Sequence, residues 1–400
     1  MKKDPDIPVR LIVTTPAGDV PVRGEAGRQS VPAGPPGTQS DGEVRYAPYL
    51  EAVRRFIFRG SCRHILSALS IRLGRNVDLG EIQGVEIRTE KHGYSYQVAR
   101  VDVSVSGETV SFVVNAAVSQ KAKCLLQKEF RLLQRLHRRF NLPYLPAVFY
   151  MGSEPYQEPG EPVRRLAMFV GEWFRDFHEF HLHRDHTTSA TRTLLWDMGA
   201  GYRYLSESQC AALYRQSANI LTLYYDWNTF RHIYPWHHAA GDFVVRQEQE
   251  RVELRLITVR DYVPVVSYTS RKAAAKRLAL VLFFLHLTVQ MRLDRLDGVG
   301  EVVWAPDFCL HGAVAGFFQG LAAPSRRDRK QIPTPLEFLE LLRTFTRQDW
   351  VDLFVEFLDT FPLSRQELAL VSEHGEAHLG ELQRLFASLS LHESTGSPPA

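Results

Sequence analysis

The sequence lacks the features that mark several large classes of protein. It contains four cysteines and no Cys-x-x-Cys pair, so it indicates neither a disulfide framework nor a cysteine zinc site. Its longest apolar stretch covers residues 278–291, whereas a helix needs about 20 apolar residues to cross a bilayer. We therefore expect no transmembrane segment, and we interpret this stretch as a buried core helix.

A strong excess of one charge is also absent. The 48 Lys and Arg residues stand against 45 Asp and Glu residues, a net charge of +3, which indicates no nucleic-acid partner. The first residues lack the apolar run of a signal peptide, and few cysteines are typical of a reducing compartment, so we expect a cytoplasmic protein. What the sequence does contain is 44% hydrophobic residues, enough for a packed core, and 15 histidines.

Composition divides the chain into five segments. Residues 1–45 hold seven prolines, six glycines and no aromatic residue, which predicts a flexible arm with at most a short strand at its apolar triplet, 11–13. The five predicted segments are a disordered arm (1–45), a helical extension (46–83), an N-terminal lobe (84–170), a helical C-terminal lobe (171–391) and a disordered tail (392–400).

Two hydrophobic periods locate the elements. Helical spacing of apolar residues predicts helices over 49–73, 122–140 and 206–225, and throughout the region after 271. Alternation with period two predicts an antiparallel meander over 85–89, 101–105 and 110–114, strands near 145–150 and 166–170, and a hairpin over 243–259. Strands with one long helix, then helices with one hairpin, predict an α+β fold of two unequal lobes.

Glu129 is an acidic residue in an otherwise apolar and basic helical pattern. Leu125, Leu126, Leu132 and Leu133 lie three or four residues from it, so on a helix they share its face. A charged carboxylate on an apolar face is costly without a partner. One hypothesis is that Glu129 holds a cation or orients a catalytic group. The alternative is a border position from which the carboxylate reaches water.

The order of these elements is similar to that of protein-kinase-like proteins. The stretch KEFRLLQRLHRRFNLPYLPAVFYMG resembles the helix-and-strand segment of aminoglycoside-phosphotransferase-like and lipopolysaccharide-kinase-like families. LAMFVGEW resembles their hinge strand, and YPWHHAAGDFVV with ELRLITVRDYV resembles their catalytic loop and metal-binding segment. The resemblance covers residues 84–360. It implies a protein-kinase-like two-lobed fold, with one long helix in a small antiparallel-sheet lobe and a mainly helical second lobe that contains a β-hairpin.

The resemblance also implies a nucleotide-phosphate clamp in the first lobe. Such a clamp pairs a strand lysine with a helix glutamate, under a glycine-rich loop. Glu129 would be that glutamate, but the lysine position falls at Asn115, and the loop is reduced to Gly93 in EKHGYSY. Lys121 and Lys123 lie just downstream and would replace the missing lysine by reaching back.

In the second lobe the resemblance places the catalytic and metal-binding residues. Asp242 stands before the apolar triplet 243–245, where a magnesium-binding Asn is expected, and Asp261 maps to the second metal ligand. His237 stands five residues before Asp242, where the proton-accepting aspartate is expected. A neutral imidazole accepts a proton near pH 7, so it could take over that role. In a rival register Asp242 is itself the base, which puts the polar residues 248–250 in the following buried strand.

These assignments predict a divergent phosphotransferase that acts on a hydroxyl of a small molecule or glycan, with ATP and Mg²⁺ as cofactors. The main alternative is a catalytically silent pseudokinase that serves as a binding or scaffold protein for a protein partner. The missing lysine, aspartate and asparagine motivate that alternative.

A histidine cluster supplies a third hypothesis. The sequence HEFHLHRDH, from His178 to His186, contains residue types that bind zinc and other transition metals. It is not an HExxH motif, because His181 follows His178 by three residues rather than four. The choice lies between a metal-binding protein that uses this cluster and a polar, solvated loop.

Overall fold

Two units make up the chain, Met1–Arg175 and Asp176–Ala400, and we describe each by itself. Each unit contains both helices and strands, so the predicted α+β fold of two lobes is confirmed. The computed structural model describes residues 7–15, 18–31, 44–90, 96–158, 160–185, 187–188, 190–197, 201–266, 273–323 and 332–390.

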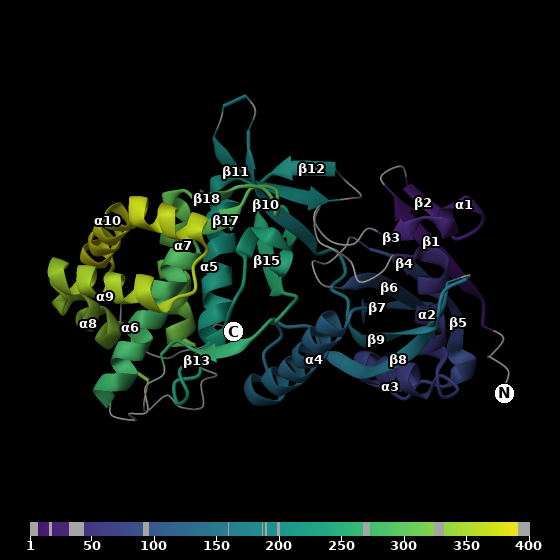
Figure 1. Ribbon diagram of the computed structural model, residues 1–400. Coiled ribbons are helices and arrows are strands. Elements are labelled where there is room, and N and C mark those ends of the chain that lie inside the picture. The colour runs from purple at the N-terminus through teal and green to yellow at the C-terminus, as the bar shows by residue number, and fades with distance from the viewer. Residues whose placement is uncertain are drawn as a thin grey trace. The chain divides into compact units, whose positions relative to one another are not determined.

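The first unit is built on a seven-stranded sheet in the order β2-β1-β5-β6-β7-β9-β8 (Figure 1). Strand β1 pairs with β5 in parallel, and the other neighbours are antiparallel. The strands are β1 (Val9–Thr15), β2 (Gly18–Pro21), β5 (Ile82–Thr89), β6 (Gln97–Val105), β7 (Glu108–Ala117), β8 (Val148–Tyr156) and β9 (Arg164–Glu172). The predicted three-stranded meander is confirmed by β5, β6 and β7.

Alternation along the strands gives the sheet two different faces. One face carries apolar side chains such as Val101 and Phe112, which form a core with Tyr49 and Phe56 of α2. Helices α2 (Tyr46–Phe58) and α3 (Arg63–Leu73) cover this face. Short elements complete the unit: α1 (Glu25–Arg28), β3 (Ser30–Val31), β4 (Val44–Arg45) and the 3₁₀ turn η1 (Leu79–Glu81).

The other face of the sheet is covered in part by α4 (Gln120–Phe140), which confirms the long helix predicted between strands. Leu126 of α4 packs with Ala117 of β7 and Phe169 of β9. Ser119 caps the helix by accepting a hydrogen bond from the backbone N–H of Ala122 at 3.1 Å. The packing of α4 on this sheet face therefore determines which side of the helix is buried.

The second unit contains a five-stranded sheet in the order β12-β11-β10-β14-β15. Its strands are β10 (His178–Arg184), β11 (Thr191–Asp197), β12 (Gly201–Tyr204), β14 (Phe243–Glu248) and β15 (Arg251–Leu256). The predicted hairpin is β14–β15. Two small antiparallel pairs accompany the sheet: β13 (Arg231–Ile233) with β16 (Tyr262–Pro264), and β17 (Leu293–Arg295) with β18 (Val302–Trp304).

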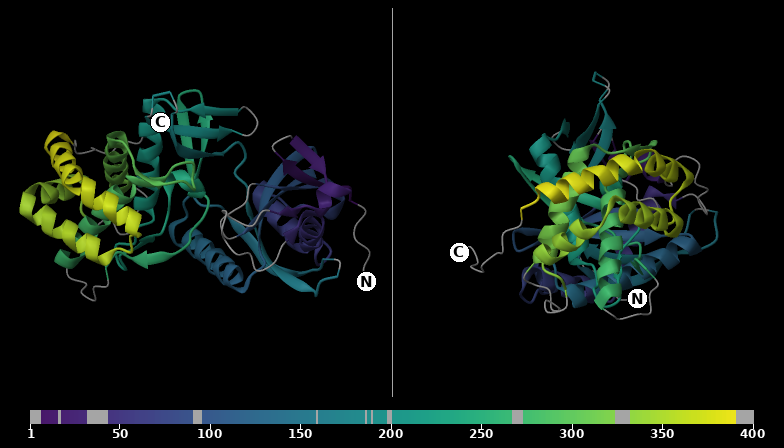
Figure 2. Two further views of the ribbon diagram at one scale, coloured as in Figure 1. Left: turned by 45° about the horizontal axis from the view of Figure 1, so that its top comes forward. Right: turned by 90° about the vertical axis from the view of Figure 1, so that its left-hand side faces the viewer.

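The helices of the second unit are α5 (Glu207–Leu223), α6 (Ala273–Gln290), α7 (Asp307–Ala322), α8 (Pro335–Thr344), α9 (Arg347–Thr360) and α10 (Arg365–Ser388). Helices α5 and α7 lie side by side, and α8, α9 and α10 form a group at the C-terminal end of the chain (Figures 1 and 2). Helix α6 contains most of the apolar stretch noted above, and residues 279–290 of it are buried as predicted. A π-helical turn, η2 (His238–Asp242), leads into β14.

Helices α8, α9 and α10 each begin with a capping box. Each has a Ser or Thr cap whose oxygen accepts from the third helical backbone N–H, while the acidic side chain at that position accepts from the cap N–H. In α8 the two residues are Thr334 and Glu337. These local signals are why the sequence folds into separate helices here rather than one long helix.

Three features differ from the sequence-based expectation. The arm contains more than the short strand expected at 11–13, because β1 spans seven residues and pairs with β5, and β2, α1 and β3 follow it. The helix expected over 49–73 is two helices, broken where Gly60, Ser61 and Cys62 all have positive φ. The region after 271 is not helical throughout, because β17 and β18 interrupt it.

Candidate functional site

Glu129 is buried in α4, with 4% of the residue exposed. Leu126, Leu132 and Leu133 are buried on the same face, as the spacing predicts, whereas Leu125 is 37% exposed. The alternative in which the Glu129 carboxylate reaches water is therefore wrong. Whether the residue serves a nucleotide clamp stays a prediction.

The other residues predicted for the clamp also belong to the first unit where the structure describes them. Asn115 is half-buried in β7 and lies opposite Phe169 of β9. The ring of Phe169 packs on Phe130 of α4, with centroids 5.7 Å apart, so Asn115 lies on the sheet face that α4 covers. Lys121 is exposed and Lys123 half-buried in the first turn of α4. Gly93 lies outside the described residues.

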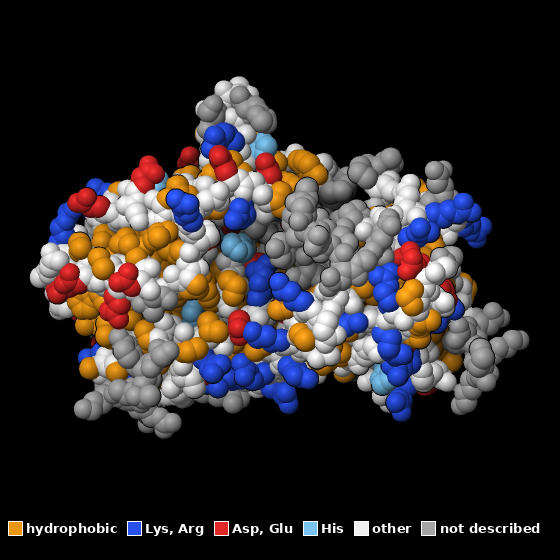
Figure 3. All heavy atoms as spheres, viewed as in Figure 1, with side chains coloured by type: hydrophobic (Ala, Val, Ile, Leu, Met, Phe, Trp, Pro, Cys, Tyr) orange, Lys and Arg blue, Asp and Glu red, His pale blue; other side chains and the backbone are white. Residues whose placement is uncertain are grey.

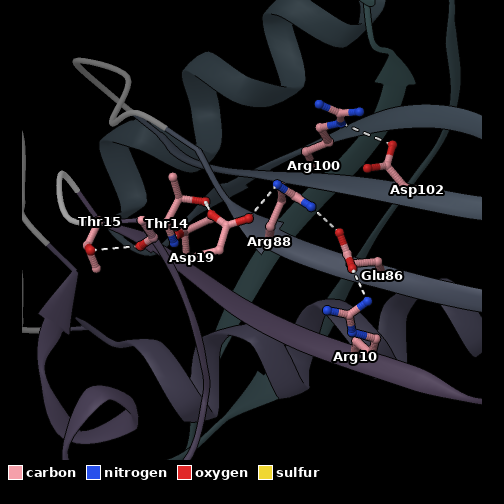
Figure 4. Close-up of polar contacts among 10 residues, drawn as sticks. Arg10, Thr14, Thr15, Asp19, Glu86, Arg88, Arg100 and Asp102 are labelled. Atoms are coloured by element: carbon pink, nitrogen blue, oxygen red, sulfur yellow. Dashed lines mark hydrogen bonds and ion pairs between the residues drawn. The ribbon is translucent and has the colours of Figure 1, made fainter. Parts of the chain in front are cut away.

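The same sheet face carries a cross-strand set of charges on β1, β2, β5 and β6 (Figure 4). Arg88 lies between Asp19, at 2.8 Å, and Glu86, with which it forms an ion pair. Glu86 in turn contacts Arg10 at 3.2 Å. On β6, Arg100 donates to Asp102 at 3.0 Å. These alternating charges compensate one another across the strands.

Glu90 follows β5 beside this set and has an unusual acidity. Burial raises its pKa to about 7, although the positive charges of Arg100 and Arg88 act in the opposite direction. In the unfolded chain the group has the ordinary glutamate pKa of 4.5. Between these two pKa values the folded protein binds the extra proton, so folding stability must fall as the pH rises through this interval.

Replacing Glu90 with glutamine should remove this pH dependence. We expect E90Q and the parent to have equal stability below pH about 4.5 and the variant to be more stable above pH about 7, by on the order of 3 kcal/mol. Urea titrations between these limits measure the difference. E108Q, at an exposed position of β7, is the matched control and should leave the pH profile unchanged. Parallel profiles for E90Q and the parent would contradict the assignment.

Asp242 is the most constrained of the residues predicted in the second unit. It ends the π-helical turn and is 2% exposed. Both of its carboxylate oxygens accept hydrogen bonds from the guanidinium of Arg260, and Oδ2 also accepts from the backbone N–H of His237 at 2.7 Å. The backbone carbonyl of Asp242 accepts from Ile257 N–H at 2.8 Å. The carboxylate therefore ties three segments together.

Of the other two residues predicted here, His237 contacts Asp242 directly. Asp261 directly follows Arg260, and its carboxylate accepts from the backbone N–H of Tyr262 at 2.8 Å. His237 is half-buried and contributes its backbone N–H to Asp242. The Asp242 carboxylate is therefore occupied by an arginine and a backbone N–H, and a role of these three residues in catalysis or metal binding stays a prediction.

The histidine cluster forms a strand, β10, rather than a polar loop. Its histidines face three different carboxylates: His178 lies 3.7 Å from Asp197, His181 lies 3.2 Å from Glu179, and His183 lies 2.8 Å from Asp297. His181 is 2% exposed and packs on Trp196. Because these side chains do not converge, they provide no common metal position. His186 lies outside the described residues.

The sequence-based reasoning missed a buried pair beside His237. The imidazole of His238 has its Nδ1 3.1 Å from the carboxylate of Asp294, and neither side chain is exposed. Burial lowers the pKa of His238, while the charge of Asp294 acts against that shift. Tyr214 packs edge-on against the imidazole, with centroids 4.8 Å apart. We interpret the pair as structural, since it lies inside the core. No local pattern links residues so distant in sequence.

A pocket of about 400 Å³ is formed by α6 and the start of α8. Its lining residues are Arg277, Pro333, Leu336, Glu337, Glu340 and Leu341. The lining thus combines one arginine, two glutamates and three apolar side chains. Hydrogen bonds from the backbone and hydroxyl of Thr334 lower the pKa of Glu337, and the positive charge of Arg277 adds to that shift.

The pocket was also missed, although the sequence carries a signal for part of it. Positions 333, 336, 337, 340 and 341 have the spacing of a single helix face, and this face mixes acidic with apolar side chains. An ordinary core-facing stripe would be apolar. Arg277 has no such signal, because only the packing of α6 beside α8 brings it to this face.

Comparison with known proteins gives a distant similarity. No family model matches the chain. It is 23% identical over 241 residues to the sodium-dependent nutrient amino acid transporter 1 of Drosophila erecta, covering 55% of this chain and 34% of that protein. The transporter of the same name from Drosophila persimilis is 23% identical over 234 residues, 55% of this chain and 32% of that protein. The chain thus spans about a third of the length of these curated relatives.

These similarities correct the predicted function. The names of the relatives point to amino acid transport rather than phosphotransfer, so the prediction of a divergent phosphotransferase, with its pseudokinase and metal-binding alternatives, is wrong. Among the described residues, no group of three or more His, Cys, Asp or Glu is placed to hold a metal ion. Binding of ATP and Mg²⁺ at the residues named above stays a prediction.

In the part of the chain that the structure describes, no helix combines the length and the apolar character needed to cross a membrane.

Proposed function

We propose that this chain binds a free amino acid in the pocket formed by α6 and α8. Two observations support the proposal. The curated relatives are named as amino acid transporters, and the pocket lining combines Arg277 with Glu337, Glu340 and three apolar side chains. The second observation carries the argument, because it matches the chemistry of one ligand class.

A free amino acid is a zwitterion, so its site needs a cation and an anion a few atoms apart. The guanidinium of Arg277 has the planar, forked geometry that holds a carboxylate through two hydrogen bonds. The carboxylate of Glu340, or the free oxygen of Glu337, accepts from the ligand ammonium. Leu336 and Leu341 then face the ligand side chain, which favours apolar amino acids.

The contacts that Glu340 and Glu337 already make leave both carboxylates able to bind a ligand. Glu340 pairs with Arg343 at 2.8 Å, but such an exposed helical pair contributes only about 0–1 kcal/mol. A ligand ammonium therefore competes with Arg343 at small cost. Glu337 accepts from Thr334 N–H through Oε2 at 2.7 Å. The pocket volume falls within the range of about 300–1,000 Å³ that is usual for small-molecule sites.

Calorimetric titration of the full chain with leucine tests the proposal. We expect saturable binding of leucine, and at least tenfold weaker binding of leucine amide and N-acetylleucine, because each lacks one of the two charges. R277Q should weaken leucine binding by about 10–100-fold, the loss expected for charge-assisted hydrogen bonds. R251Q removes an exposed arginine of β15 and serves as the control.

Two results would overturn the proposal. One is the absence of binding for every apolar amino acid tested. The other is unchanged leucine affinity in both R277Q and E340Q, because the ligand would then bind elsewhere.

A further inference from the structure

The solvent face of α4 carries charge of a single sign. Six exposed cations belong to this helix: Lys121, Lys128, Arg131, Arg135, Arg138 and Arg139. Its acidic residue, Glu129, lies on the opposite, buried face. Lys and Arg side chains gather over this part of the surface in Figure 3. The net charge of the whole chain is only +3, so this is a local concentration.

Four of these cations follow one another along the helix at spacings of three and four residues. We call them the basic stripe: Lys128, Arg131, Arg135 and Arg138. Residues three and four apart are neighbours on a helix surface, and like charges at these spacings repel. The stripe therefore weakens the isolated helix. Other helices of the chain place acidic residues at such positions, as Glu381 is placed beside Arg384 in α10. An arrangement that opposes folding is typical of a binding surface.

The geometry of the stripe favours a flat anionic partner. Its four cations extend over roughly 15 Å of helix, given a rise of about 1.5 Å per residue, and all point away from the buried side. The exposed positions of α4 include no aromatic residue, whereas single-stranded nucleic acids are usually held by stacking on aromatic rings. Leu125, 37% exposed, lies one turn before Lys128. An apolar side chain beside cations is typical of helices at a membrane interface.

From these observations we propose that the basic stripe docks the protein on a lipid bilayer surface rich in anionic head groups. The cations contact lipid phosphates and carboxylates, and Leu125 contacts the acyl boundary. The apolar side of α4 stays packed on the sheet, so docking needs no unfolding of the helix. This surface lies in the first unit and is independent of the amino acid pocket in the second.

Vesicle sedimentation with the full chain tests the proposal. We expect binding to vesicles of phosphatidylcholine and phosphatidylserine, little binding to phosphatidylcholine alone, and loss of binding in high salt. Each cation near an anionic surface strengthens binding by about fivefold, so R131Q/R135Q/R138Q should bind roughly a hundredfold more weakly. The variant R131K/R135K/R138K keeps the charges and should bind like the parent.

A control variant separates the stripe from overall charge. R23Q/R63Q/R251Q removes three exposed arginines outside α4 and should change vesicle binding by less than about threefold. Equal losses in the two glutamine variants would overturn the proposal, as would absence of binding to the phosphatidylserine vesicles. Tight binding of duplex DNA or RNA without vesicle binding would also overturn it and assign the stripe to a nucleic acid.

Discussion

Replacing Gly316 with alanine is expected to destabilise the second unit by about 3 kcal/mol or more. Gly312, Gly316 and Gly320 lie one turn apart on α7 and face α5. A Cβ at position 316 would come within 2.0 Å of the backbone carbonyl oxygen of Arg215. Since that oxygen belongs to the helix backbone, relief requires the two helices to move apart and to lose their packing.

Urea unfolding followed by tryptophan fluorescence measures this effect. The signal reports mainly on the second unit, which contains Trp196, Trp227, Trp236, Trp304 and Trp350 of the six tryptophans. G380A is the matched control, because a Cβ at position 380 of α10 meets no atom within 4 Å. Alanine there should leave stability unchanged or raise it by about 0.5–1 kcal/mol. Similar stability of G316A and the parent would mean that α5 and α7 are not packed in this way.

Removing the Asp242 side chain should have an effect of similar size. Breaking a buried ion pair from one side costs about 3–5 kcal/mol. We expect D242A to lie near the lower limit, because the Arg260 side chain is 39% exposed and can turn to water. D242N should lose less stability, since an amide still accepts from the backbone N–H of His237.

The same urea titration distinguishes the buried ion pair of Asp242 with Arg260 from an ordinary surface ion pair. Glu376 forms an ion pair with Arg347, and both side chains are largely exposed. E376A should therefore cost less than about 1 kcal/mol. A D242A variant as stable as E376A would show that the contact of Asp242 with Arg260 contributes little in solution.

Much of the fold could be predicted because its signals are local. Alternation identifies β5 to β7, and helical spacing identifies α4 with its buried Glu129. The parallel pairing of β1 with β5 could not be predicted, because it joins segments about 75 residues apart in sequence. The break between α2 and α3 was missed for a different reason. Gly60 is visible as a breaker, but nothing marks the left-handed backbone of Ser61 and Cys62.

The candidate site was less accessible to sequence reasoning. Asp242 was singled out from its position before the apolar triplet 243–245, but nothing in the sequence marks the arginine that occupies its carboxylate. Arg260 is adjacent to a predicted metal ligand, and only the hairpin register brings its guanidinium to Asp242. The pocket on α8 was hidden because its cation comes from another helix.

The capping box of α8 has a consequence for the proposed ligand pocket. Glu337 is held by Thr334 at the start of the helix, so its carboxylate has a fixed orientation before any ligand arrives. A side chain that is already ordered loses little rotamer entropy on binding, which is the basis of preorganisation. The residue pair that starts the helix therefore also sets one acidic wall of the pocket in place.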